Sequence, residues 1–187
     1  ELSSSQIKGL TTTQISNLPE ASIQALTPTQ LKALSAAQIN AIPEELIEKI
    51  HVSSLSSTQL KGLAVDKVDN LSDTQVNALS PAQIKALSPE QVRALGAKIK
   101  HLGTNVQVLS AKQVQALEET YIQALQPEQI AALTATQIKA LTPDQLSKFG
   151  DDRLSALKGK EHIAHLSAAQ INALSDAQIQ QLDVEGV

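Results

Sequence analysis

An eight-residue repeat dominates the sequence and restricts the folds that it can adopt. Units such as LSPAQIKA from Leu79 and LTATQIKA from Leu133 share the consensus Leu, Ser/Thr, any, any, Gln, Ile/Val, any, Ala. About twenty-three such units fill the chain, with irregular units near 46–55, 95–109 and 157–166. Stacked repeats of this kind form one continuous array. We therefore predict a single repeat domain over residues 1–187, as a fragment of a longer polypeptide.

A single long helix and a β-sheet are both incompatible with this repeat. In a continuous helix of about 100° per residue, the Ile/Val position would drift by about 80° per unit and never form a face. Proline also recurs at one position of the unit, where it would break such a helix. In a strand, Leu and Ile five residues apart would face opposite sides.

Each unit instead contains the sequence pattern of a helix start. Ser or Thr followed three residues later by Gln is a capping box, and the Leu before the cap with the Ile after the Gln forms a hydrophobic staple. Thirteen units contain the box. The residues to which we assign these structural roles in three representative units are Leu26, Thr27, Gln30, Leu79, Ser80, Gln83, Ile84, Leu133, Thr134, Gln137 and Ile138.

The predicted fold class is all-α, an α-solenoid of about twenty-three very short capped helices. Five prolines occupy the first helical position, which needs no N–H donor. Helices this short are unstable alone, so they must stack and bury Leu and Ile between them. Coils of two, three or four units are all compatible with the repeat. The Gln side chains either cap their own helix, the interpretation that we favour, or form a ladder of amides between coils.

Composition excludes several classes of function. The absence of Cys excludes disulfides, thiolate catalysis and Cys-based zinc sites. A formal net charge of −4 gives no electrostatic basis for binding nucleic acid or anionic lipid. The apolar runs are too short for a transmembrane helix.

Few residues suggest a chemical site. Glu161, His162 and His165 are close enough on one predicted helix, within 158–165, to form a weak candidate metal site, although loop and surface residues also collect in irregular units. No catalytic or cofactor-binding residue is predicted, because capping explains the abundant Ser and Thr. Basic residues that follow the Ile/Val/Leu position form either a binding ridge or a solvated face. They are Lys8, Lys32, Lys61, Lys85, Arg93, Lys100 and Lys139.

Strings such as ALSPAQIKALSPEQVRAL resemble the tandem LTxxQIxA arrays of large proteobacterial secreted and surface proteins, which are adhesin-like or haemagglutinin-like. This resemblance covers nearly the whole chain. It implies an exported, extended segment that acts as a stalk or an adhesive surface, and it transfers no functional residues. A shorter string, LTPDQL from Leu141, is similar to the opening of the repeats of transcription-activator-like effectors, but the base-reading pairs of those repeats are not found here.

The sequence therefore predicts a non-enzymatic structural or protein-interaction solenoid, a spacer or adhesive segment of a large secreted bacterial protein. It is expected at the cell surface or in the medium, with no cofactor and with protein partners on a host or cell surface, or other copies of itself. An alternative is a secreted effector domain, a virulence factor that binds a host protein through its solenoid surface. A nucleic-acid-binding repeat protein is a further alternative.

Overall fold

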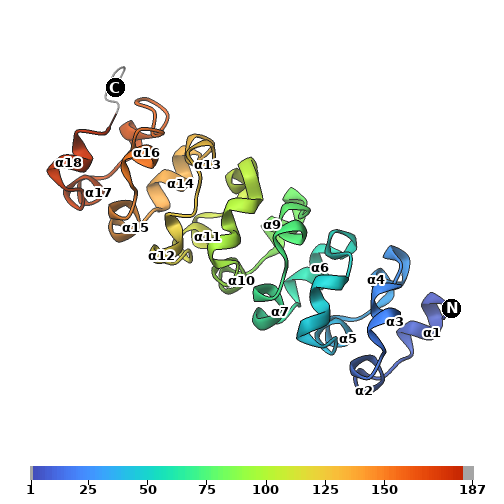
Figure 1. The fold of residues 1–187 in the computed structure, drawn as a ribbon. Coiled ribbons are helices and arrows are strands. Elements are labelled where there is room, and N and C mark those ends of the chain that lie inside the picture. Colours follow the sequence, from blue (N-terminus) through green and yellow to red (C-terminus); the bar gives the residue numbers. More distant parts are fainter. Residues whose placement is uncertain (1, 183–187) are drawn as a thin grey trace. The chain divides into compact units, whose positions relative to one another are not determined.

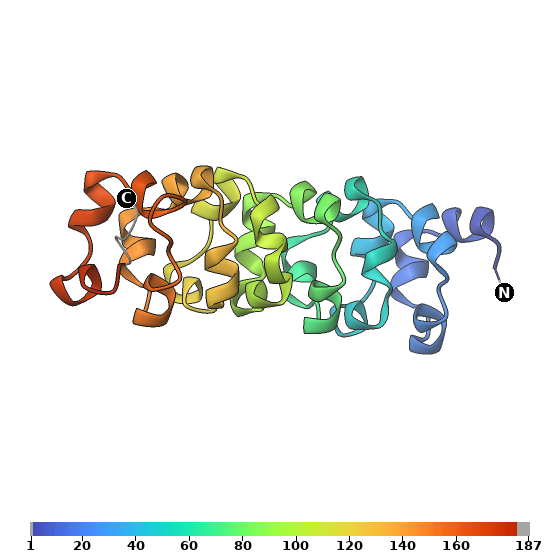
Figure 2. The same cartoon turned by 90° about the horizontal axis from the view of Figure 1, so that it is seen from above.

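The computed structural model describes residues 2–182, and over this range the chain is all-α. It contains eighteen α-helices (α) and four 3-10 helices (η), and no strand occurs among the described residues (Figures 1 and 2). Contacts divide the chain into two compact units, Glu1–Leu95 and Gly96–Val187, called unit 1 and unit 2 below.

Most helices are four to six residues long, so each is little more than one turn. Unit 1 contains α1 (Ser4–Lys8), α2 (Thr12–Ser16), α3 (Glu20–Gln24), α4 (Pro28–Ala33), α5 (Ala36–Asn40), η1 (Glu44–Lys49), η2 (Val52–Ser54), α6 (Ser57–Lys61), α7 (Val65–Asp69), α8 (Asp73–Asn77), α9 (Pro81–Ala86) and α10 (Pro89–Ala94). Unit 2 contains η3 (Gly96–Val108), α11 (Ala111–Gln115), α12 (Glu119–Ile122), α13 (Pro127–Ala131), α14 (Ala135–Ala140), α15 (Pro143–Ser147), α16 (Asp151–Leu154), η4 (Ile163–His165), α17 (Ala168–Asn172) and α18 (Asp176–Ile179).

The helices begin where the capping boxes predict. Ser80, for example, is extended (φ −72°, ψ 157°), and its Oγ accepts a hydrogen bond from Gln83 N at 3.2 Å while Ser80 N donates to Gln83 Oε1 at 2.9 Å. All thirteen predicted boxes have both bonds. The five recurring prolines each open a helix: Pro28, Pro81, Pro89, Pro127 and Pro143. Local sequence therefore sets where each helix starts.

Helices pack in a regular order along the sequence within each unit. In unit 1, α1 contacts α4, α2 contacts α5, α6 contacts α9, and α7 contacts α10. In unit 2, α11 contacts α14, α12 contacts α15, and α13 contacts α16. Each helix thus packs against the third helical segment after it, which corresponds to three repeats per layer.

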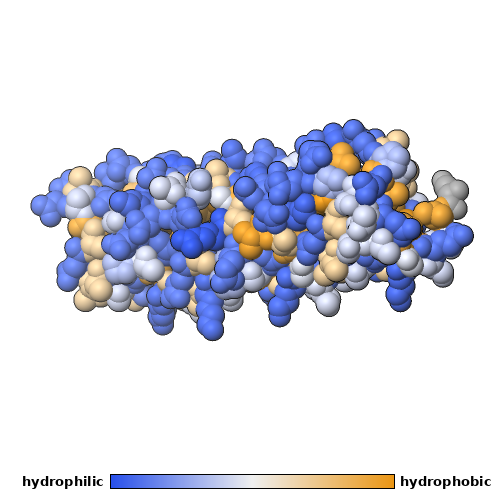
Figure 3. All heavy atoms as spheres, turned by 90° about the horizontal axis from the view of Figure 1, so that it is seen from below, coloured by the Kyte–Doolittle hydropathy of each residue, from blue (hydrophilic) through white to orange (hydrophobic). Residues whose placement is uncertain are grey.

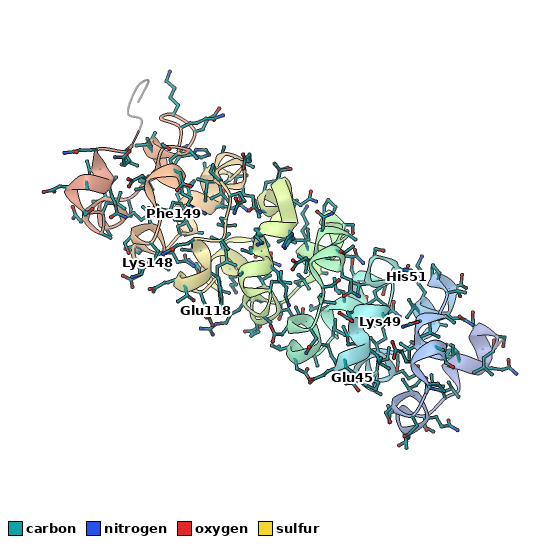
Figure 4. All side chains as sticks on the ribbon, in the orientation of Figure 1. Glu45, Lys49, His51, Glu118, Lys148 and Phe149 are labelled. Atoms are coloured by element: carbon teal, nitrogen blue, oxygen red, sulfur yellow. The ribbon has the colours of Figure 1, made fainter. Side chains whose placement is uncertain are left out.

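The Leu and Ile residues of the consensus make the core. Leu133 and Ile138 are 6% and 0% exposed, and nearly every equivalent Leu, Ile or Val is buried. Phe149 replaces the consensus Leu before α16 and is also buried, whereas the adjacent Lys148, labelled beside it in Figure 4, is exposed. The core is accordingly thin, and each short helix depends on the helices packed against it for burial.

The three irregular regions form 3-10 helices and turns. The segment after Pro43 forms the 3-10 helix η1, followed by η2. In η3, Gly96 and Gly103 have φ values of 54° and 53°, which favour glycine, and an added Cβ at Gly96 would touch the Tyr121 ring at 3.6 Å.

The helical stretch predicted over 158–165 is largely wrong. Turns occupy 158–162, and only Ile163–His165 forms a short 3-10 helix, η4. The carbonyl of Lys158 accepts from both His162 N (2.8 Å) and Ile163 N (3.1 Å), which closes a wide turn rather than a regular helix.

Candidate functional site

The consensus Gln side chains connect successive layers of helices. Gln83 Nε2 donates to Val52 O at 3.1 Å and to Leu55 O at 2.8 Å, the first residue of η2 and the residue that follows this helix. Val52 O also accepts a hydrogen bond from Leu55 N at 3.0 Å, so the Gln side chain adds a second donor to this carbonyl. Equivalent bonds to carbonyls of the preceding layer are made by Gln30, Gln38, Gln59, Gln75, Gln91, Gln129, Gln137, Gln145, Gln170 and Gln178. We call this set the amide ladder.

Capping and the ladder, which the sequence presents as alternatives, occur in the same side chain. The Oε1 atom of Gln137 accepts from Thr134 N at 2.9 Å, while its Nε2 atom donates to Val106 O at 2.7 Å and Leu109 O at 2.9 Å. A carboxamide has both an acceptor and two N–H donors, so one residue serves both functions. Gln137 is only 1% exposed, so all three bonds are shielded from water.

Three units replace the ladder Gln by a side chain that still donates to the preceding layer. Lys67 Nζ donates to Ile42 O at 2.8 Å, and Arg153 Nε donates to Leu125 O at 3.0 Å. His162 Nε2 lies 2.9 Å from Leu133 O. These substitutes were not predicted from the sequence, although Lys67 and Arg153 follow their cap residues by the same three positions as the consensus Gln.

The predicted metal site at His162 and His165 does not assemble. The nitrogens of His162 contact backbone atoms, Leu133 O and Lys158 N, and its side chain is 1% exposed. Glu161 lies in the preceding turn, 3.8 Å from Lys158 Nζ, not on the same helix as His165. Among residues 2–182, no group of three or more His, Asp or Glu side chains could hold a metal ion.

The basic residues that the sequence assigns either to a binding ridge or to a solvated face are divided among different stacks of helices. Lys8 and Lys32 lie on the contacting helices α1 and α4, whereas Lys61 and Lys85 lie on the separate pair α6 and α9. All seven predicted basic residues are exposed. Lys61 and Lys85 border a shallow depression that Ser57 and Ser88 also line. On the face drawn in Figure 3, hydrophilic residues cover most of the surface.

Acidic residues of unit 1 gather on one stack of helices. The helices α3, η1, α7 and α10 contact one another in that order. Seven of the eight acidic residues between positions 2 and 95 lie on them, and all seven are exposed. We call this set the acidic column: Glu20, Glu44, Glu45, Glu48, Asp66, Asp69 and Glu90. Lys49 pairs with Glu48 at 2.8 Å, and Figure 4 labels Lys49 and Glu45 on η1.

Two carboxyl groups of this column share a hydrogen bond. The bond between Glu44 on η1 and Asp66 on α7 raises the pKa of Glu44 and lowers the pKa of Asp66 from their ordinary values. As pH falls, the Glu44 carboxyl becomes protonated before that of Asp66, and its O–H donates a hydrogen bond to the Asp66 carboxylate. The contribution of Glu44 to stability is therefore present at acidic pH and is lost as pH rises through its raised pKa.

Replacement of Glu44 by Gln is expected to raise the thermal unfolding temperature at pH 7. The amide N–H₂ can donate to Asp66 at every pH, and the repulsion between two carboxylates disappears. The gain should shrink toward pH 4, where Glu44 of the unmodified chain is protonated. Thermal unfolding followed by circular dichroism at both pH values measures it. The first-turn variant Glu128→Gln is the control, and an equal gain in both variants at pH 7 would contradict the pairing.

One part of the repeat region matches a known family of repeats. Residues 114–151 match the family model of the ALTTAQ repeat. Within this range, the string ALTATQ from Ala132 spans the link and first turn of α14. A comparison with curated proteins gave no match. The chain therefore contains a segment of ALTTAQ-type repeats, and it folds as short helices. None of the described helices is both long and apolar enough to cross a membrane.

Proposed function

We propose that each compact unit is an α-solenoid with three short helices per coil, and that the chain is a non-enzymatic protein-interaction segment. It serves as a spacer or adhesive part of a large secreted bacterial protein. The solenoid architecture is supported by the amide ladder, because each Gln bonds to a carbonyl one layer earlier, 25 to 32 residues back. Such arrays typically present extended binding surfaces.

The acidic column is the observation that supports protein binding. Its carboxylates project from four stacked helices, and Val65 on α7 leaves an apolar side chain 48% exposed beside them. Seven carboxylates outnumber the exposed cations Lys49 and Arg93 on these helices, and an excess of negative charge around an exposed apolar group suits a partner with a basic surface. The same charge repels nucleic acid and anionic lipid, so we expect neither as a partner.

Binding to host cells tests the adhesive function. Fluorescently labelled protein is incubated with cultured epithelial cells and measured by flow cytometry. The triple variant Glu20→Lys, Glu45→Lys and Glu90→Lys is expected to bind at least about tenfold less. The control Glu119→Lys, Glu128→Lys and Asp144→Lys makes the same charge change at exposed first-turn positions of unit 2 and should bind normally.

Three results would contradict this proposal. Equal binding by both triple variants would show that the acidic column is not the binding surface. If the unmodified chain does not bind to the cells, the adhesive function is contradicted and the spacer function remains. Tight binding of duplex DNA at low salt would favour the nucleic-acid alternative. Export is tested separately, by an antibody against this segment applied to medium, surface and cytosol fractions, where detection in the cytosol alone would contradict secretion.

A further inference from the structure

His162 occupies a ladder position in the irregular segment 158–166. Its Nδ1 atom lies 2.9 Å from the backbone N of Lys158, the same contact that Oε1 of a ladder Gln makes with the backbone of its cap residue. Its Nε2 atom lies 2.9 Å from Leu133 O in the preceding layer. The side chain is 1% exposed. The imidazole therefore reproduces both contacts of the ladder amide.

The two contacts require one particular form of the ring. The N–H of Lys158 can only donate, so Nδ1 must accept, and Leu133 O can only accept, so Nε2 must donate. A neutral imidazole with its hydrogen on Nε2 satisfies both. A second proton on Nδ1 would place two N–H donors against each other in a buried position, and the hydrogen bond to Lys158 would be lost.

We propose that protonation of His162 opens the segment 158–166, so that unit 2 has an acid-sensitive joint. This function goes beyond protein binding and does not depend on it. Gln occupies most other ladder positions and does not titrate, so those positions lack this response. Opening would expose Leu157 and Ile163, which are buried in the closed form.

The surrounding charges do little to stabilise a buried imidazolium. Glu161 is the one carboxylate of this segment, and its side chain is 67% exposed and paired with Lys158 at 3.8 Å. The remaining ionisable groups are the cations Lys160 in the segment and Lys139 on the contacting helix α14, and the imidazole of His165. The following helix α17 has no ionisable side chain. The segment therefore offers no unpaired carboxylate to a protonated ring.

Amide hydrogen exchange tests the proposal on the whole chain. Exchange of peptides covering 156–166 is compared between the unmodified chain and His162→Gln at pH 8 and at pH 5. At pH 8 the two should exchange alike, because Gln supplies the same acceptor and donor. At pH 5 the unmodified chain should exchange about tenfold faster. His165→Gln is the control and should retain the acid response.

Two results would overturn the proposal: an acid response that persists in His162→Gln, or one that disappears in His165→Gln. Nitrogen NMR of the unmodified chain provides a second measurement that does not depend on a variant folding. At pH 8 the His162 ring should be neutral with its hydrogen on Nε2, and the Lys158 amide signal should shift or broaden as the ring protonates. A hydrogen on Nδ1 at pH 8 would contradict the proposed contacts.

Discussion

Replacement of Ile138 by Asp is expected to unfold the layers around α14. Ile138 is 0% exposed, and α14 packs against α11 on one side and contacts η4 on the other. A carboxylate at this position loses its hydration without gaining a partner, and the core loses a buried Ile. The free energy of unfolding should fall by about 4 kcal/mol or more. The loss should extend to neighbouring layers, because each repeat is stabilised only by adjacent repeats.

The exposed neighbour Lys139 provides the control. Lys139→Ala should change the free energy of unfolding by less than about 0.5 kcal/mol. Urea denaturation followed by circular dichroism measures both variants, and hydrogen exchange shows whether protection is lost in α11, α14 and η4. Similar stability of the two variants would show that the Ile column is not the core of unit 2.

The sequence predicts the local structure well because the relevant forces act within one repeat. The contacts between Thr134 and Gln137, and the place of Pro143 at the start of α15, depend on residues at most three apart. The all-α class follows from the same pattern. The buried positions of Leu133 and Ile138 also follow, since they are the only large apolar residues of their repeat.

The arrangement of layers could not be predicted, because it depends on contacts between repeats that are nearly identical in sequence. Any Gln could reach any carbonyl as far as the consensus shows, so the pairing of Gln137 with Val106 and Leu109 is a product of packing. The substitutes Lys67, Arg153 and His162 were missed for the same reason. Their role is visible only when the carbonyl of the preceding layer is in place.

The acidic column could not be predicted from the sequence either, because it depends on which helices stack on one another. Glu20, Glu45 and Asp66 are far apart in the sequence, and net charge alone suggests only a mixed surface. With three repeats per layer, every third helix of unit 1 falls on the same stack, so acids placed on α3, η1 and α7 become neighbours. By the same geometry, Lys8, Lys32, Lys61 and Lys85 fall on other stacks, whereas Arg93 lies on α10 in the stack of the acidic column.

Replacement of Gln137 by Glu separates the two functions of the ladder side chain. Glu serves as well as Gln in a capping box, so capping alone predicts almost no change in stability. The amide of Gln137, however, also donates to Val106 O and Leu109 O, which lie 2.7 and 2.9 Å from Nε2. A carboxylate there would face two carbonyl oxygens in a buried site without a donor. The free energy of unfolding at pH 7 should fall by about 3 kcal/mol.

Gln14→Glu is the matched control, because Gln14 is exposed and makes the capping contacts with Thr11. Its free energy of unfolding should change by less than about 0.5 kcal/mol. Urea denaturation at pH 7 compares the two variants. Equal changes in the free energy of unfolding would show that Gln137 stabilises the chain through helix capping alone. Repeating it at pH 4 adds a test of mechanism. Protonation of the introduced carboxyl supplies one O–H donor toward the two carbonyls, so part of the lost stability should return in Gln137→Glu and not in Gln137→Leu, which has no donor at any pH.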